Sequence, residues 1–206
     1  MIYEIRTYTL TPGSIPEFEE RFKAALPSRT PYSELAAFWH TEFGPLNQVI
    51  HVWPYDDLGH RTEVRRRLAK EPGWPPKTSE LVLSMQSEIF TPAPFSQKLG
   101  GGKKLGNVYE MRIYQYRPGS IPTVIERFET ALKGGRTELS PLAACMSSEL
   151  GLLNVWIHIW PYASLDDRER VRQESLKLDT WPPKTREMLV SQQNKILIPA
   201  SFSPMA

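Results

Sequence analysis

The feature that most constrains this chain is an internal repeat. The stretch YEIRTYTLTPGSIP at residues 3–16 returns as YEMRIYQYRPGSIP at residues 109–122, at an offset of 106. IHVWPY at 50–55 and WPPKT at 74–78 return as IHIWPY and WPPKT at an offset of 107. A single added residue separates the two offsets, so the sequence indicates two copies of one domain in tandem.

A short glycine-rich segment separates the two copies. QKLGGGKKLG, residues 97–106, has three consecutive glycines among lysines, a composition typical of a flexible linker. The predicted organisation is a first repeat at 1–96, a linker at 97–106 and a second repeat at 107–206. Each repeat then has an ordinary size for a domain.

Hydrophobic patterns and turn residues predict the elements of one copy. Ser14 and Glu17 form a capping-box pattern at the start of a helix, and Pro27 is expected to end that helix. The expected elements, in chain order, are a strand at 3–10, a helix from Ser14, strands at 35–42 and 47–53, a helix from about Asp57 and a strand at 81–90. This is the β-α-β-β-α-β order of a ferredoxin-like unit.

Such a unit carries its helices on one face of an antiparallel sheet and leaves the other face bare. Two units in one chain can cover each other. The predicted fold class is therefore α+β, with two tandem ferredoxin-like repeats whose antiparallel sheets pack face to face as an intramolecular α/β barrel.

Strand alternation gathers unusual polar side chains on one face of each sheet. Tyr3, Ile5, Ile50 and Val52 fall on the opposite face and are expected to meet the helices. The polar face is expected to line the barrel interior, and its members are Glu4, Arg6, Tyr8, Asn47, His51 and Trp53 in the first copy and Glu110, Arg112, Tyr114, Asn154, His158 and Trp160 in the second.

Two interpretations of this polar face stay open. Its side chains could satisfy one another as a polar barrel core, since unpaired buried polar groups are costly. Alternatively, they could line a cavity for a small planar or anionic ligand, with arginine binding the anion and His51 or His158 as the catalytic acid or base. Because Trp156 replaces Val49, the second cavity is expected to be narrower.

Whole-chain properties exclude several classes of protein. A formal net charge of +2 is too small for a nucleic-acid-binding surface, and the single cysteine excludes an internal disulfide. No apolar run is long enough to span a membrane, and the first residues read as a strand rather than a signal peptide. Cytoplasmic localisation is therefore expected. His40 and His60 have no histidine counterpart in the other copy, so no metal ion and no cofactor is expected.

The motifs YEIRTYTLTPGS, HVWPYDDLGHRTEVR and its counterpart HIWPYASLDDRERVR resemble the NIPSNAP family. The resemblance covers both halves and implies the dimeric α/β barrel superfamily, with the pair of units formed here within one chain. The wider superfamily includes cofactor-independent monooxygenases and isomerases, but a fold alone does not select an activity.

Three hypotheses about function follow. The chain could bind a small molecule without chemistry, act as a monooxygenase-like or isomerase-like enzyme, or serve as a protein-interaction scaffold. Further association into a homodimer is compatible with each of them. A binder or enzyme requires a real cavity lined by the polar face, whereas a scaffold requires a filled barrel and an exposed apolar patch on the helices.

Overall fold

The computed structural model describes all residues, 1–206, and shows the predicted element order twice. The first repeat comprises β1 (Ile2–Leu10), α1 (Ile15–Arg29), β2 (Ala37–Phe43), β3 (Gln48–Tyr55), α2 (Leu58–Leu68) and β4 (Val82–Pro92). The second comprises β5 (Val108–Tyr116), α3 (Ile121–Ala131), a π-helical turn (Leu132–Arg136), α4 (Thr137–Leu139), β6 (Ala144–Leu150), β7 (Val155–Tyr162), α5 (Leu165–Ser175) and β8 (Leu189–Pro199).

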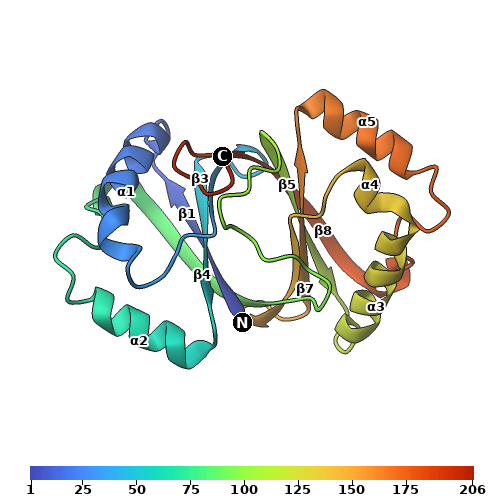
Figure 1. The fold of residues 1–206 in the computed structure, drawn as a ribbon, viewed down its shortest axis with the longest axis horizontal. Coiled ribbons are helices and arrows are strands. Elements are labelled where there is room, and N and C mark those ends of the chain that lie inside the picture. Colours follow the sequence, from blue (N-terminus) through green and yellow to red (C-terminus); the bar gives the residue numbers. More distant parts are fainter.

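The eight strands form one closed antiparallel barrel in the order β1-β3-β2-β8-β5-β7-β6-β4. The two seams between the repeats are the β2–β8 and β4–β6 pairs, so each repeat contributes a contiguous half of the barrel. The helices lie outside, with α1 and α2 against the first half and α3, α4 and α5 against the second (Figure 1). The predicted intramolecular barrel is confirmed.

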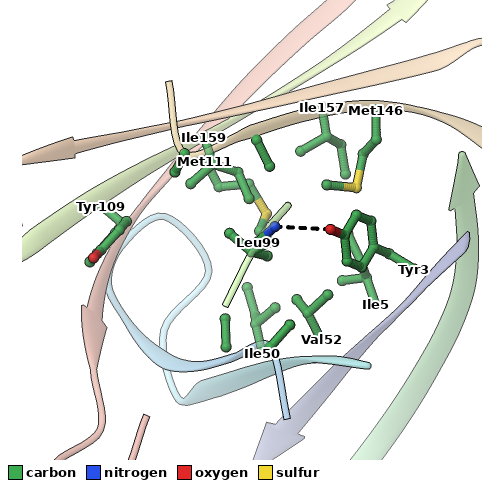
Figure 2. Packing of buried hydrophobic residues seen from close by; sticks show 14 of the residues in the cluster. Tyr3, Ile5, Ile50, Val52, Leu99, Tyr109, Met111, Met146, Ile157 and Ile159 are labelled. Carbon is green, nitrogen blue, oxygen red and sulfur yellow. Dashed lines mark hydrogen bonds between the residues drawn. The ribbon is translucent and has the colours of Figure 1, made fainter. Parts of the chain in front are cut away.

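The barrel interior is filled by apolar side chains from both repeats. Tyr3, Ile5, Ile50 and Val52 point inward toward the corresponding residues of the second half (Figure 2). The sequence analysis assigned these four residues to the helix-facing side, and that assignment is wrong. The polar face instead lies beneath the helices, where Tyr8 and Trp53 pack with residues of α1 and α2.

The apolar face of each sheet points into the barrel because the two faces have different polar groups to pair. Strand alternation separates two faces but does not say which one closes on the other repeat. A barrel interior shared by two halves is buried on all sides, and burial of unpaired polar groups is costly, so the apolar face fills it. The polar face is covered by helices, which supply Arg29 and Arg61 as partners for its polar groups.

The segments that follow β4 and β8 are exchanged between the repeats. After β4, the Ser96 hydroxyl accepts a hydrogen bond from Cys145 N–H of the second repeat, at 3.0 Å. After β8, the Ser203 hydroxyl accepts one from Phe38 N–H of the first repeat, also at 3.0 Å. Each repeat therefore packs its terminal segment on the other.

The predicted linker is not simply solvated. Leu99 is 1% exposed and lies within the barrel cluster, where its N–H donates to the Tyr3 hydroxyl at 2.9 Å (Figure 2). Gly100 is also buried, with φ +91°, and a Cβ at this position would lie 2.8 Å from Ala36 Cα. The segment therefore does more than connect the repeats, because Leu99 is part of the barrel core.

Two local predictions in α1 also fail. The Ser14 hydroxyl donates to Thr11 O at 2.6 Å and makes no cap to the helix N–H groups, so the capping box does not form. Pro27 lies inside the helix, which continues to Arg29. That extra length matters because it places Arg29 in the lining of the first cavity, within hydrogen-bond distance of Tyr55.

Candidate ligand-binding cavities

Each repeat contains a cavity of about 590 Å³ between its half of the sheet and its helices. The first is bounded by β1 and β3, by α1 and α2, by the loop 74–79 and by the start of β4. Among the sequence-predicted site residues, Glu4, Arg6, Tyr8, His51 and Trp53 line it. The polar face thus forms one wall of a cavity outside the barrel, not inside it.

The Glu4 carboxylate organises the charged side of the first cavity. It accepts hydrogen bonds from Arg6 at 2.9 Å, Arg61 at 2.7 Å and Ser87 at 2.6 Å. Burial alone would raise the pKa of Glu4, but the hydrogen bonds from Arg61 and Ser87 and the charge of Arg6 lower it to about 2. Glu4 is therefore ionised and fully partnered.

His51 lines the first cavity and is 2% exposed. Its Nδ1 accepts a hydrogen bond from the Trp53 indole N–H at 2.6 Å. An indole N–H can only donate, so a neutral His51 carries its proton on Nε2. That Nε2 has no hydrogen-bond partner in the protein, which leaves a buried donor without an acceptor.

The protonation of His51 sets its chemical role. Burial, together with the positive charges of Arg6 and Arg29, lowers its pKa well below the ordinary value of 6.5. A neutral imidazole with Nδ1 occupied offers one N–H to a ligand. The role of His51 as an acid or base stays a prediction; in this structure its geometry is that of a hydrogen-bond donor.

Arg29 is a buried, charged residue of the cavity lining that the sequence analysis missed. It is 5% exposed, and its guanidinium carbon lies 3.6 Å from the centre of the Trp53 ring and 5.0 Å from that of Trp74. It donates to the Tyr55 hydroxyl at 2.8 Å rather than to a carboxylate, and its Nε has no partner. A signal was present, because an Arg-Thr pair recurs at 29–30 and 136–137.

The second cavity repeats this arrangement on the second half of the barrel. His158 Nδ1 accepts from the Trp160 indole N–H at 2.6 Å, and its Nε2 is unpartnered. Arg136 lies 3.9 Å from the centre of the Trp160 ring. Burial first, then the charge of Arg112, lowers the pKa of His158 well below 6.5. The predicted residues that line this cavity are Glu110, Arg112, Tyr114, His158 and Trp160.

Two predicted ligand-binding residues lie elsewhere. Asn47 and Asn154 occupy left-handed turns, with φ of 57° and 59°, immediately before β3 and β7. Asparagine is one of the residues that tolerates this conformation, so their recurrence has a local backbone reason. Trp156 packs on Phe128 and lines neither cavity. The expectation of a narrower second cavity is wrong, since the two volumes are equal.

No group of three or more histidine, cysteine, aspartate or glutamate side chains is arranged to hold a metal ion. No helix combines the length and the apolar character that crossing a bilayer requires.

The sequence of this chain is similar to those of known proteins over nearly its whole length. The NIPSNAP family model matches residues 3–97 and again 109–204. Protein NipSnap homolog 3A of Homo sapiens is 36% identical, over 100% of this chain and 86% of that protein. Protein NipSnap homolog of Dictyostelium discoideum is 33% identical, over 98% and 88% respectively.

A crystal structure from Lactobacillus acidophilus, of a protein provisionally named a monooxygenase, has a TM-score of 0.67 at 12% identity, covering 96% of this chain and 93% of that one. At that identity the likeness concerns the fold. The barrel and its two outer cavities define a two-repeat α/β barrel protein whose halves come from one chain. Within that class, the chain belongs to the NIPSNAP family.

Proposed function

We propose that each cavity binds a small molecule that carries a carboxylate group on a planar or otherwise apolar body. The observation that carries the proposal is the Arg29 guanidinium. It is buried, it has no carboxylate of its own, and it lines a cavity. A buried charge is normally paired, and a ligand carboxylate would supply the missing partner.

The surroundings of Arg29 support the same chemistry. Stacking on Trp53 fixes the plane of the guanidinium and leaves its edge for an anion. The unpartnered Nε2–H of His51 supplies a further donor. Three guanidinium groups, those of Arg6, Arg29 and Arg65, line this cavity against the single carboxylate of Glu4, so the site is electropositive.

The walls favour an apolar ligand body. Phe18, Phe22, Trp53 and Trp74 line the first cavity, and aromatic side chains accept a planar ring by offset or edge-to-face contacts. The recurrence of the arrangement in the second copy, with Phe128, Trp160 and Trp181, supports one binding site in each repeat.

Isothermal titration calorimetry with benzoate tests the proposal, with benzamide as a neutral ligand of the same shape. Two sites are expected for benzoate and none for benzamide. Arg29→Met should weaken one site and Arg136→Met the other, each by roughly 1.5–3 kcal/mol, the usual worth of a hydrogen bond to a charged group. The exposed Arg66→Met is the control.

Equal binding of benzoate and benzamide, or unchanged affinity in both arginine variants, would overturn the proposal. If a variant does not fold, the wild-type protein still gives an answer. The indole N–H signals of Trp53 and Trp160 in nuclear magnetic resonance spectra report the two cavities separately, because each N–H is bonded to the histidine of its own cavity.

A further inference from the structure

The two cavities have similar floors but different mouths. The floor is the group of charged residues and histidine on the sheet and first helix, Glu4, Arg6, Arg29 and His51 in the first cavity, and the mouth is the remaining lining from the second helix, the 3₁₀ turn and the last strand. The charged floor residues recur pair by pair, as with Arg29 and Arg136, whereas Phe18 has no counterpart in the lining of the second cavity. At the mouth, by contrast, matching positions have diverged in chemistry. They are Leu68 and Ser175, Ser79 and Arg186, and Met85 and Gln192, with the first-copy residue named first in each pair.

We propose that the two cavities select different anions: the first a monocarboxylate with an apolar tail, the second a dicarboxylate whose far end is charged. This selectivity rests on the proposed function, because it presumes that Arg29 and Arg136 each bind one carboxylate at the floor. It adds the identity of the group at the other end of each ligand.

The first mouth presents apolar side chains to solvent. Leu83 is 66% exposed and Met85 is 55% exposed, and both line the cavity together with the buried Leu68. A ligand tail that leaves the floor in this direction would cover these side chains and remove apolar surface from water. A charged tail would lose hydration here, and the only cation at this mouth, Arg65, lies near Glu4 at 3.7 Å.

The second mouth presents polar groups at the corresponding places. Arg186 and Gln192 line it, and the buried Ser175 replaces a leucine. The carboxylate of Glu169, the guanidinium of Arg172 and the exposed Leu176 also line this cavity, so its two mouth cations face one anion. Arg186 comes from the 3₁₀ turn Arg186–Met188, and it is the counterpart of Ser79 in the turn Ser79–Leu81. A guanidinium and an amide can bind a second carboxylate, whereas a terminal methyl group would leave them without a partner.

Two ligands of one shape separate the alternatives: 4-propylbenzoate and 4-(2-carboxyethyl)benzoate, which differ only in a terminal methyl or carboxylate group. Affinities are measured by calorimetry in Arg136→Met, which leaves the first cavity intact, and in Arg29→Met, which leaves the second. The first cavity should favour the propyl compound, and the second the dicarboxylate, each by at least about tenfold.

Exchange of the exposed mouth residues should then exchange the preferences. In the first cavity the change is Ser79→Arg with Met85→Gln, and in the second it is Arg186→Ser with Gln192→Met. All four positions are exposed, so the variants are expected to fold. If Arg29→Met or Arg136→Met does not fold, the indole N–H signals of Trp53 and Trp160 give both affinities in one wild-type titration.

The outcomes distinguish this inference from the proposed function. Equal affinity of both compounds at both cavities, or preferences that do not follow the exchanged residues, would overturn the selectivity while leaving carboxylate binding intact. If neither compound bound to the first or to the second cavity, both proposals would be overturned together.

Discussion

Neighbouring residues of β1 and β3 enter two quite different environments. Ile5 and Val52 join an apolar cluster inside the barrel that contains no group titrating near neutral pH. Glu4, Arg6 and His51 lie between the sheet and the helices, in a layer that holds buried charges and a cavity. The interior joins the two repeats, and the outer layer holds the buried charges and the cavities.

The contacts that join the two repeats are separate from the residues that form each cavity. Each cavity is lined by residues of one repeat alone, so a site does not need groups from both halves. The shared interior supplies stability and fixes the two sheets. Changes inside the barrel should therefore affect the whole molecule, whereas changes in an outer layer should affect one site.

The largest expected effect comes from the charged network of the outer layer. Glu4→Gln removes the carboxylate that partners Arg6 and Arg61, and should lower the free energy of unfolding by about 3 kcal/mol, the amount that corresponds to a pKa moved from 4.5 to about 2. Urea denaturation measures it. The exposed Glu63→Gln, which removes a surface partner of Arg66, should change little.

The ionised Glu4 carboxylate should also make the stability of the fold depend on pH in the acid range. Because the pKa of Glu4 is lower in the folded protein, its contribution is complete above about pH 4.5 and is lost as the pH falls toward 2. Glu110, whose pKa is also about 2, should act in the same window. A Glu4→Gln variant that lost stability equally at pH 7 and pH 2.5 would contradict this account.

The barrel interior is tested at Leu99. Leu99→Ala leaves a cavity in the shared cluster and should cost about 3 kcal/mol, within the range for buried leucines. Because that cluster belongs to both repeats, unfolding should remain one cooperative transition, and benzoate affinity at the two cavities should not change. Lys98→Ala, at the exposed neighbour, is the control. Loss of one benzoate site in Leu99→Ala would break the separation between interior and outer layer.

The two buried histidines should make the stability of the outer layers depend on pH. The pKa values of His51 and His158 are depressed in the folded protein, so the unfolded chain binds protons first. Stability is then complete above about pH 6.5 and falls below it by up to about 1.4 kcal/mol per pH unit for each histidine.

Urea midpoints at pH 7, 6 and 5 measure that slope, well above the range of Glu4. His51→Gln should remove about half of it and His51→Gln with His158→Gln nearly all. A slope that persisted in the double variant would locate the titrating group elsewhere.

The smallest expected effect is that of Gly101→Ala, which serves as the reference for Gly100→Ala in the segment between the repeats. Gly100→Ala combines a positive φ with a Cβ placed 2.8 Å from Ala36 Cα, whereas Gly101→Ala has a positive φ and open space. Gly101→Ala should cost about 1 kcal/mol for backbone strain, and Gly100→Ala should cost about 1–3 kcal/mol more. Equal thermal unfolding of the two variants would mean that Gly100 does not approach Ala36 closely.

Much of the architecture could be predicted from the sequence because it rests on local patterns that occur twice. Turn residues and alternating strands gave the two β-α-β-β-α-β units, and their bare sheet faces gave the barrel. The face assignment failed because alternation at Glu4 and Ile5 distinguishes two sides but not their neighbours. What covers each side is a tertiary property.

The candidate site, too, could be predicted only where it depends on local sequence patterns. His51, Trp53 and Arg6 were predicted to lie together, and the structure brings them together. Arg29 was missed because Pro27 was taken as the end of α1, and a helix continuing past proline depends on its packing. Asn47 was included because it shares the strand alternation, yet its conformation belongs to the preceding turn.

The exchanged segments after β4 and β8 make this chain the covalent equivalent of a domain-swapped dimer. Each repeat completes the other through Ser96 and Ser203, and the intervening segment replaces an encounter between two molecules by an encounter within one. A short tether of this kind maintains an effective concentration in the millimolar range. Assembly of the barrel is thereby independent of protein concentration, and a cell needs only one copy of the chain to obtain both cavities.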